Sequence, residues 1–244
     1  MRGKEHMTPE SPKVALILCG GMGTRLKSVL PDIPKPMVHV AGRPFLETLI
    51  DQVREWGIER VVLGTGYKGE IIEAHFGTLW KQLPIAYARE SKPLGTAGAM
   101  RFALPQLSGD SFVVLNGDSY CGVDFAKLLG AHRKLRSKVT MALFKVSDVS
   151  RYGAVNLLDD GRVRGFVEKR DIPREGMINA GIYIIKRSVI ESLPDGVNLS
   201  FEHDILPKLV GNILGGSKMP GPFIDIGTPE SLAAAENFFA QIGN

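Results

Sequence analysis

The first half of the chain alternates between two hydrophobic patterns. Short runs of Val, Ile and Leu, typical of buried strands, are separated by segments in which apolar residues recur every three or four positions, as on a helix that packs one face against a sheet. This alternation predicts a parallel, doubly wound sheet. The expected strands are Val14–Cys19, Arg60–Gly64, Ile85–Glu90 and Ser111–Asp118, and the expected helices are Pro44–Trp56, Glu70–Phe76, Gly95–Leu104 and Phe125–Leu135.

From Lys138 onward the strand-like runs follow one another without helices between them. Turn residues at 159–161 and 173–176 separate these runs, which indicates antiparallel strands that fold over the parallel sheet as a second lobe. The fold class is therefore α/β, with a Rossmann-like, doubly wound, mixed but mainly parallel sheet and an antiparallel lobe. The expected elements are strands at Val139–Val146, Ala154–Leu158, Arg162–Glu168, Gly181–Ile185 and Pro222–Ile226, and helices at Phe201–Val210 and Pro229–Ile242, the last capped by Thr228.

Composition indicates an ordinary soluble globular protein. With 244 residues, 44% of them hydrophobic and 23% charged, the chain has material for one domain, placed at 12–244. No apolar run approaches the roughly 18 residues of a membrane-spanning helix. The polar N-terminus lacks a secretory signal, which predicts a cytoplasmic protein, and residues 1–11 are expected to be a disordered leader or tag remnant.

Charge, cysteine and histidine content exclude several kinds of site. The formal net charge is +4, and the densest basic stretch, residues 132–138, lacks interleaved aromatic residues, so we expect a solvated helix end and no nucleic-acid partner. Cys19 and Cys121 are too few for a disulfide framework. The five histidines lack the spacing of a zinc site.

A glycine-rich loop follows the first strand. Gly20, Gly21 and Gly23 lie where the chain turns, and small residues there let backbone N–H groups contact an anion. Arg25 can form a forked contact with two phosphate oxygens, and Lys35, in a stiff Pro-Lys-Pro segment, can add a point charge. This chemistry suits a triphosphate, although glycine turns without a ligand also follow many strands.

Two familiar phosphate motifs are excluded at this loop. A P-loop would end in Gly-Lys-Ser or Gly-Lys-Thr, which is absent. The dinucleotide fingerprint would need a third glycine where Leu26 stands. The loop therefore predicts a different kind of nucleotide site.

Several carboxylates also stand at candidate positions. Asp118 and Asp225 each end an apolar strand, where open parallel sheets bind ligands, and both could supply the oxygen ligands that Mg²⁺ prefers. A strand-end Asp also commonly caps a turn, and spacing alone does not pair these two. Glu90 could accept hydrogen bonds from guanine or cap a helix. The pair Glu168-Lys169 taken alone is typical of an exposed strand.

The pattern Gly-Gly-x-Gly-Thr-Arg-Leu followed by Pro-Lys-Pro resembles the signature of the sugar-1-phosphate nucleotidyltransferases. The resemblance continues in the family's order from near residue 13 to the end of the chain. Its further motifs are Glu90–Gly98, Asn116–Asp118, Tyr152-Gly153, Glu168-Lys169, Asn179–Tyr183, Phe201-Glu202 and Asp225–Pro229.

The resemblance implies a role for each matching residue. Arg25, Lys35 and Lys169 are expected to be catalytic, and Asp118 and Asp225 are expected to hold Mg²⁺. The expected nucleotide-binding residues are Leu18, Gly20, Gly21, Gly23, Thr24, Arg25, Lys35, Glu90, Pro93, Gly95 and Thr96, and the expected sugar-phosphate-binding residues are Asn116, Gly153, Glu168, Lys169 and Asn179.

The implied reaction joins a sugar 1-phosphate to a nucleoside triphosphate. A phosphate oxygen of the sugar 1-phosphate attacks the α-phosphorus, and pyrophosphate leaves. Since a phosphate monoester is already a competent attacking anion, no protein nucleophile is required. Catalysis is then expected to consist of positioning and charge neutralisation by Arg25, Lys35, Lys169 and Mg²⁺.

The segment Glu90–Gly98 most resembles the guanylyltransferases, which favours GTP. The compact length resembles the enzymes that act on D-glycero-α-D-manno-heptose 1-phosphate in bacterial capsule and surface-layer pathways, without a C-terminal domain. The alternatives are a mannose-1-phosphate guanylyltransferase and a uridylyltransferase for a hexose or N-acetylmuramic acid 1-phosphate. A non-catalytic regulatory subunit that binds sugar nucleotides is a different class, and the complete set of charged residues argues against it. A homo-oligomer is left open.

Overall fold

The computed structural model describes residues 11–21, 32–150, 152–167, 174–211 and 213–242. The expected leader, except for its last residue, lies outside these ranges. So do Gly23, Thr24, Arg25, Glu168 and Lys169 of the expected site.

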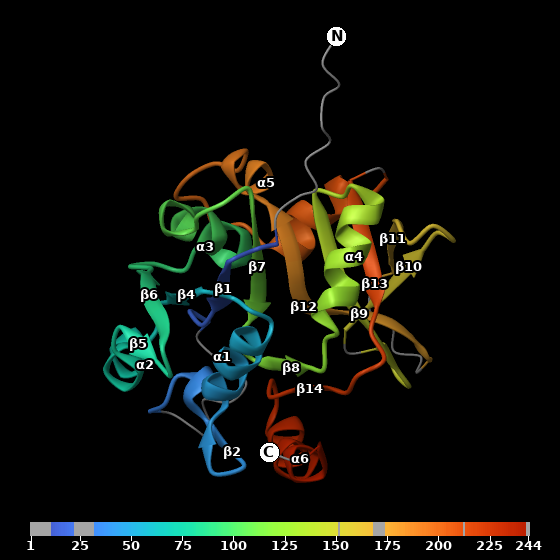
Figure 1. Cartoon of the computed structure of the whole chain (residues 1–244). Helices are drawn as coiled ribbons and strands as arrows, with labels where there is room; N and C mark the ends of the chain where they lie inside the picture. Colours follow the sequence, from blue (N-terminus) through green and yellow to red (C-terminus); the bar gives the residue numbers. More distant parts are fainter. Residues whose placement is uncertain (1–10, 22–31, 151, 168–173, 212, 243–244) are drawn as a thin grey trace.

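An eight-stranded sheet in the order β13-β9-β12-β7-β1-β4-β6-β5 forms the centre of the molecule (Figure 1). Strands β7, β1, β4 and β6 are mutually parallel, β12 runs antiparallel between β7 and β9, and β13 is parallel to β9. The prediction of a mixed, mainly parallel sheet is therefore confirmed. The strands are β1 (Val14–Leu18), β4 (Arg60–Thr65), β5 (Leu79–Trp80), β6 (Leu83–Arg89), β7 (Ser111–Asn116), β9 (Val139–Val146), β12 (Gly176–Lys186) and β13 (Leu214–Lys218).

The central strands are buried on both faces because apolar residues occupy nearly every position. Leu16 of β1 pairs with Val62 of β4 and with Val114 of β7, and all three are fully buried. Successive side chains of a strand point to opposite faces, so Leu16 and Ile17 belong to different hydrophobic cores. The continuous apolar run in the sequence thus corresponds to a sheet covered on both sides.

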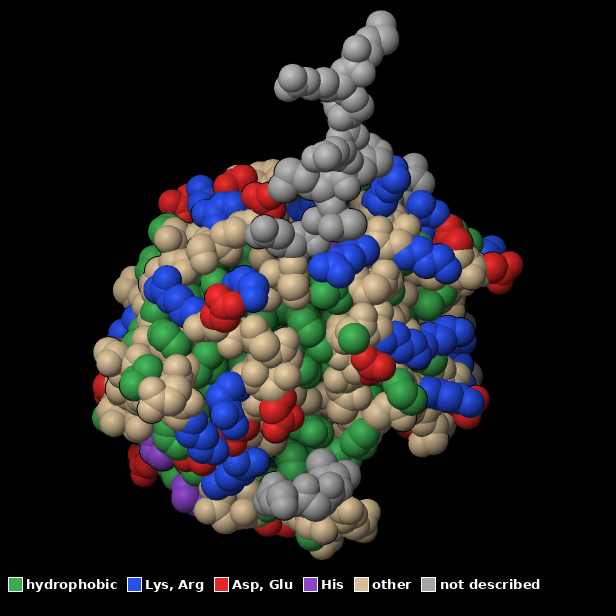
Figure 2. All heavy atoms as spheres, in the orientation of Figure 1, with side chains coloured by type: hydrophobic (Ala, Val, Ile, Leu, Met, Phe, Trp, Pro, Cys, Tyr) green, Lys and Arg blue, Asp and Glu red, His purple; other side chains and the backbone are tan. Residues whose placement is uncertain are grey.

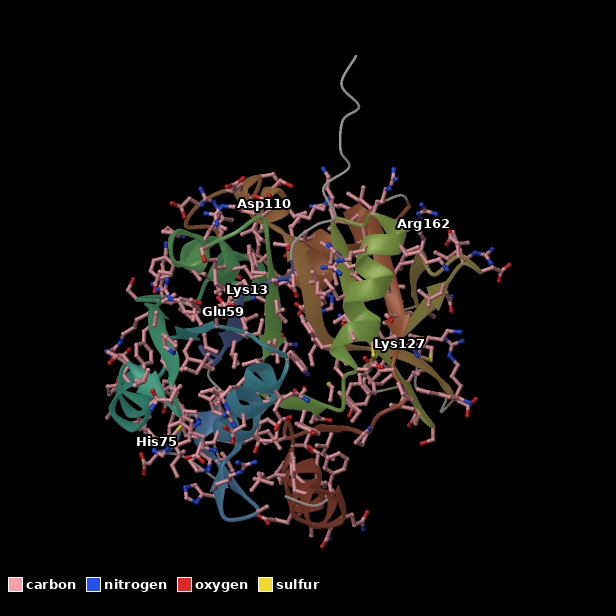
Figure 3. The ribbon with its side chains drawn as sticks, viewed as in Figure 1. Lys13, Glu59, His75, Asp110, Lys127 and Arg162 are labelled. Carbon is pink, nitrogen blue, oxygen red and sulfur yellow. The ribbon has the colours of Figure 1, made fainter. Side chains whose placement is uncertain are left out.

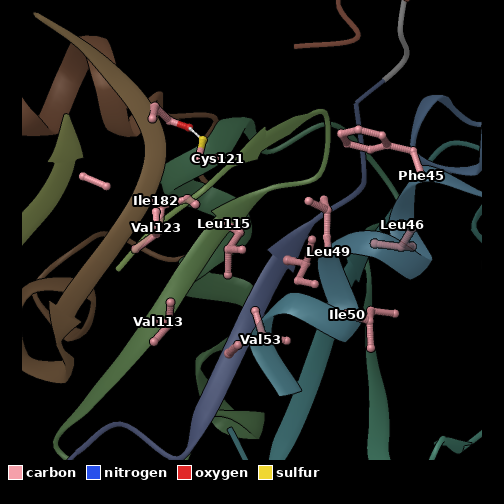
Figure 4. Close-up of a cluster of buried hydrophobic side chains, with 14 of the residues drawn as sticks. Phe45, Leu46, Leu49, Ile50, Val53, Val113, Leu115, Cys121, Val123 and Ile182 are labelled. Atoms are coloured by element: carbon pink, nitrogen blue, oxygen red, sulfur yellow. Dashed lines mark hydrogen bonds between the residues drawn. The ribbon is translucent and has the colours of Figure 1, made fainter. Parts of the chain in front are cut away.

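Helices cover the two faces of this sheet. Helix α1 packs Leu49 and Val53 against the core that also contains Val113 and Leu115 of β7 (Figure 4). Helices α2, α4 and α6 contribute to the same core, whereas α3 and α5 contribute to the core on the other face. The helices are α1 (Phe45–Glu55), α2 (Gly69–Phe76), α3 (Gly95–Ala103), α4 (Phe125–Leu135), α5 (Arg187–Glu191) and α6 (Pro229–Ile242).

Within the described ranges, three two-stranded antiparallel sheets accompany the main sheet. The sequence predicted that the antiparallel strands of the second half form a lobe over the main sheet. Among the described strands of that half, only β10 and β11 form such a separate sheet, whereas β9 and β12 belong to the main sheet itself. The predicted strand near residues 222–226 is β14, which pairs with β8 and not with the main sheet. The small sheets are β2 (His39–Val40) with β3 (Arg43–Pro44), β8 (Ser119–Cys121) with β14 (Phe223–Asp225), and β10 (Ala154–Leu157) with β11 (Val163–Val167).

The predicted helix at 201–210 was wrong in type. Residues Phe201–Ile205 form a π-helical turn and Leu206–Leu209 a 3₁₀ helix. Pro207 is one physical reason, because it has no N–H to donate to the carbonyl oxygen four residues earlier, although Leu206 before it keeps helical backbone with φ −54° and ψ −41°. By contrast, the hydroxyl of Thr228 accepts a hydrogen bond from the N–H of Ser231, 3.2 Å away, as predicted for the cap of α6.

Strand β13 was missed, and its sequence Leu-Gly-Gly-Ser-Lys explains why. It lacks the β-branched and aromatic residues that mark most strands. The glycines are required by neighbours: a Cβ at Gly216 would lie 2.7 Å from Leu143 Cδ1, and one at Gly215 would lie 2.7 Å from Ser137 Oγ. Close packing against β9 and α4 therefore selects this strand.

The basic stretch at 132–138 lies where expected, at the C-terminal end of α4. Arg133, Lys134, Arg136 and Lys138 are exposed. Figure 2 shows the Lys and Arg side chains of this face in several separate groups. Among the helices that the structure describes, none combines the length and the apolar character needed to cross a membrane.

His132 differs from its basic neighbours because it is buried, and its ring Nδ1 lies 2.8 Å from Thr140 Oγ1. Burial, together with the charges of Lys186 and Arg133, lowers the pKa of His132 to about 4. His132 is protonated more easily in the unfolded chain than in the folded protein. The free energy of unfolding should therefore fall by about 3 kcal/mol as the pH drops from about 6.5 to about 4.

The measurement is chemical denaturation between pH 8 and pH 4. The variant His132→Gln should flatten this dependence, whereas His39→Gln, which changes an exposed histidine, should retain it. An unchanged profile in a folded His132→Gln protein would contradict the assignment.

Candidate functional site

The candidate site lies at the carboxyl ends of β1 and β7. The opposite end of the sheet is marked by the ion pair of Lys13 and Glu59, 2.5 Å long, which precedes β1 and β4 (Figure 3). At the site end, the N–H of Gly117 donates to Leu18 O, 2.9 Å away, and a Cβ at Gly117 would lie 2.5 Å from that oxygen. Glycine at 117 therefore lets the end of β7, with Asp118, approach the start of the glycine-rich loop.

The two candidate metal ligands lie side by side although they are far apart in sequence. Strand β8, directly after Asp118, pairs with β14, and this places Asp225 opposite Ser119. The N–H of Ile226 also donates to the backbone oxygen of Asp118, 2.9 Å away. The pairing of strands thus brings together two carboxylates that sequence spacing did not pair.

Lys35 contacts the carboxylate of Asp118 and lies near that of Asp225. Its Nζ lies 2.6 Å from Asp118 Oδ2, and its side chain is only 14% exposed, against 41% for that of Asp118. A Cβ at Gly227 would lie 3.4 Å from Lys35 Nζ and 2.8 Å from Asp225 Oδ1, so the absent side chain leaves room for the ammonium group near both carboxylates. A cation and two anions therefore converge at one point.

Asp225 is held more firmly than Asp118. It is buried, and its Oδ1 accepts hydrogen bonds from the N–H of Gly227 (2.8 Å) and from Ser231 Oγ (3.2 Å). Its Oδ2 accepts a hydrogen bond from the hydroxyl of Tyr152. The orientation of this carboxylate is thus fixed by the protein. Tyr152 had no role in the sequence prediction, although it belongs to the Tyr152-Gly153 motif.

The donor set fits Mg²⁺. Among the described residues there is no group of three or more His, Cys, Asp or Glu side chains that could hold a metal ion. Mg²⁺, however, is often bound by one or two carboxylates together with water and substrate phosphates. Asp118 and Asp225 could therefore hold this ion only with substrate present.

Glu90 lies between the glycine-rich loop and α3. Its Oε2 accepts a hydrogen bond from the N–H of Leu94, 3.0 Å away, so Glu90 holds the residue that precedes α3 and does not cap the first turn of that helix. A Cβ at Gly20 would lie 3.6 Å from Oε1 of the same carboxylate. Burial raises the pKa of Glu90, and the bond from Leu94 offsets part of this rise. Oε2 of Glu90 thus has a structural partner, and the recognition of guanine by this carboxylate stays a prediction.

The segment 93–98 is packed against residues 197–202. Gly95 has a φ of +69°, and a Cβ there would lie 2.4 Å from Leu199 O. The oxygen of Pro93 accepts a hydrogen bond from Asn198 Nδ2 at 3.1 Å, and the hydroxyl of Thr96 donates to Glu202 at 2.6 Å. These groups are used within the protein, so nucleotide binding by Pro93, Gly95 and Thr96 stays a prediction.

The expected sugar-side residues Asn116 and Asn179 both lie next to Gly181, at the irregularity of β12. Gly181 has a φ of +74°, and a Cβ there would lie 2.4 Å from Asn116 Nδ2. Asn179 donates to the hydroxyl of Tyr183 (2.8 Å) and accepts from the N–H of Gly181 (3.2 Å). Gly153, the remaining described residue of this set, has a φ of +80° and follows Tyr152. The sugar contacts themselves stay predictions.

Comparisons with known proteins agree with this geometry. The sequence pattern of the family described as "Nucleotidyl transferase" matches residues 14–242. Mannose-1-phosphate guanylyltransferase of Mycobacterium tuberculosis is 40% identical over 89% of this chain, which spans 62% of that protein. D-glycero-alpha-D-manno-heptose 1-phosphate guanylyltransferase of Aneurinibacillus thermoaerophilus is 37% identical over 91% of this chain and 96% of its own length.

A solved structure shows the same likeness. HddC from Yersinia pseudotuberculosis, in complex with GMP-PN, superposes with a TM-score of 0.82 at 38% sequence identity. The match covers 93% of this chain and 99% of that one. The likeness thus extends over both the sheet and the candidate site.

Proposed function

Because the chain belongs to the nucleotidyl transferase family, we propose that it transfers GMP from GTP to a sugar 1-phosphate and releases pyrophosphate. The observation that carries the proposal is the convergence of Lys35, Asp118 and Asp225 at the strand ends. Relatives named as guanylyltransferases, and the GMP-PN complex of HddC, support GTP as the nucleotide.

The reaction needs positioned charge rather than a protein nucleophile. An oxygen of the sugar phosphate forms a bond to the α-phosphorus, and the bond from the α-phosphorus to the bridging oxygen of pyrophosphate breaks. Lys35 would move from Asp118 to a phosphate oxygen, and Arg25 and Lys169 would neutralise further charge. Mg²⁺ held by Asp118 and Asp225 would neutralise charge on the triphosphate when bound.

We propose D-glycero-α-D-manno-heptose 1-phosphate as the acceptor. Two relatives named for this sugar, from Aneurinibacillus thermoaerophilus and Campylobacter jejuni, match over 96% and 95% of their lengths. Mannose 1-phosphate is the alternative, given the mycobacterial relative. The proposal places the protein in the cytoplasm, where GTP is available, and its product in surface polysaccharide synthesis.

Pyrophosphate release across a matrix of substrates tests this proposal. GTP, ATP, CTP and UTP would each be combined with heptose, mannose, glucose and N-acetylmuramic acid 1-phosphates in the presence of Mg²⁺. We expect the highest kcat/KM for GTP with the heptose. A preference for mannose would correct the sugar alone, and the absence of release with every pair would favour a binding subunit without activity.

Arg25 and Lys169 are expected to serve different substrates. Arg25→Ala should raise the KM for GTP, because it removes a charge from the glycine-rich loop. Lys169→Ala should instead raise the KM for the sugar phosphate or lower kcat. Calorimetry checks the division: a Lys169→Ala protein that lost nucleotide affinity and kept its sugar-phosphate affinity would contradict it.

A further inference from the structure

Glu202 lies at the centre of a hydrogen-bond network between the two substrate-binding segments. Thr96 Oγ1 donates to its Oε2 at 2.6 Å, Ser200 Oγ donates to the same oxygen at 3.2 Å, and Tyr183 donates to Oε1 at 3.2 Å. Within the described part of the chain, these donors to the carboxylate are all hydroxyl groups. The carboxylate is therefore oriented by neutral groups from α3, from β12 and from Ser200, which precedes the π-helical turn.

The branch toward β12 runs through Tyr183, which is fully buried. Its ring packs edge-on against Phe201, with the ring centroids 5.2 Å apart. Burial raises the pKa of Tyr183 well above its ordinary value, so the phenol keeps its proton. An ionised carboxylate can only accept hydrogen bonds, so the hydroxyl proton of Tyr183 points to Glu202. The phenol oxygen in turn accepts a hydrogen bond from the side-chain N–H of Asn179. Glu202, through Tyr183, thus orients the Asn179 amide together with the N–H of Gly181, which donates to Asn179 Oδ1.

The branch toward α3 runs through Thr96. Its hydroxyl donates to Glu202 and accepts a hydrogen bond from the N–H of Phe201, 2.7 Å away. Backbone bonds reinforce this contact, since Leu199 both donates to Leu94 O and accepts from the N–H of Ala97, at 2.9 Å each. The segment expected to lie against the nucleobase is thus attached to the chain that carries Glu202.

We propose that Glu202 is a positioning residue that holds the nucleotide-side segment 93–98 and the sugar-side residue Asn179 in one fixed relation. The proposal rests on the proposed guanylyl transfer. Glu202 acts through Thr96 on one side and through Tyr183 on the other, so each branch can be removed separately. Its loss should therefore affect both substrates, whereas the loss of one branch should affect one substrate.

The test measures KM for GTP and for the preferred sugar 1-phosphate in matched variants. Tyr183→Phe keeps the buried ring and should raise only the KM for sugar phosphate, by about fivefold to tenfold. Thr96→Val should raise only the KM for GTP to a similar extent, and Thr96→Ser should restore it. Glu202→Gln should raise both. Tyr87→Phe, which removes a hydroxyl bonded to Gly77 O, is the control and should change neither.

Thermal unfolding would verify that each variant folds. Equal effects of Tyr183→Phe on both KM values, or no effect on either, in an active and folded protein would overturn the positioning role alone. A wild-type protein that released no pyrophosphate with any substrate pair would contradict the proposed function and the positioning role together.

Discussion

Replacing Asp118 with Asn is expected to lower turnover by about a hundredfold or more, equivalent to about 2.7 kcal/mol in the activation barrier. The carboxylate is 41% exposed and pairs with Lys35. We therefore expect the substitution to weaken the stabilisation of charge in the transition state and to leave the free energy of unfolding nearly unchanged. Asp225→Asn should lose as much activity. It should also lower the free energy of unfolding by about 1–3 kcal/mol, because the buried carboxylate accepts several hydrogen bonds.

The measurements are kcat at saturating Mg²⁺ and calorimetric titration of Mn²⁺ in the presence of a non-hydrolysable GTP analogue. Asp110→Asn is the matched control, since Asp110 is an exposed carboxylate directly before the amino end of the same strand, β7 (Figure 3). Near-normal turnover and Mn²⁺ affinity in a folded Asp118→Asn protein would remove Asp118 from the metal site.

The wild-type protein is expected to prefer GTP over ATP, CTP and UTP by about 10⁴ in kcat/KM. Sites built around a buried hydrogen-bonding group can reject an analogue by this factor, because the group is then left unpaired. Glu90 is the proposed group, and its Oε1 lies toward Gly20 while Oε2 binds the N–H of Leu94. Glu90→Gln should therefore reduce the preference for GTP more than it lowers the maximal rate.

Steady-state kinetics with all four triphosphates checks this expectation. Glu191→Gln serves as the control, because Glu191 is an exposed carboxylate paired with Arg187 on α5. If the Glu90→Gln protein kept the full preference for GTP, the role of Glu90 would be structural only, through its bond to the N–H of Leu94. If the wild-type protein preferred UTP or CTP, the guanylyl assignment would be wrong and the family assignment would stand.

Hydrophobic periodicity correctly predicted the helices and strands whose bounds are determined by their own residues and not by contacts with distant segments. The bounds of α4, β9 and α6 agree with the prediction, because each has a regular apolar pattern and clear end signals. Strand β13 could not be predicted, since its glycines are selected by Leu143 of β9 and by Leu135 of α4. The π-helical turn at Phe201–Ile205 was not predicted either, and besides preceding Pro207 it is bonded to a distant element, since the N–H of Phe201 donates to Thr96 Oγ1 of α3.

The candidate site shows the same division. Lys35, Asp118 and Asp225 could be named from motifs because strand ends and proline-flanked cations are local features. Tyr152 and Glu202 lay within motifs of the resemblance, but nothing in the sequence gave them a role. Their roles depend on which side chain each one meets, Asp225 for Tyr152 and Thr96 and Tyr183 for Glu202. Such contacts arise only when distant segments of the chain come together.

The most direct test of guanylyl transfer follows GTP labelled at the α-phosphate, incubated with heptose 1-phosphate or mannose 1-phosphate, Mg²⁺ and the protein. We expect that the label moves into a GDP-sugar, with one pyrophosphate released per labelled product, and that Asp118→Asn slows the transfer by about a hundredfold or more. Label that stayed in GTP with both sugars, or that appeared as GMP without a GDP-sugar, would contradict this expectation.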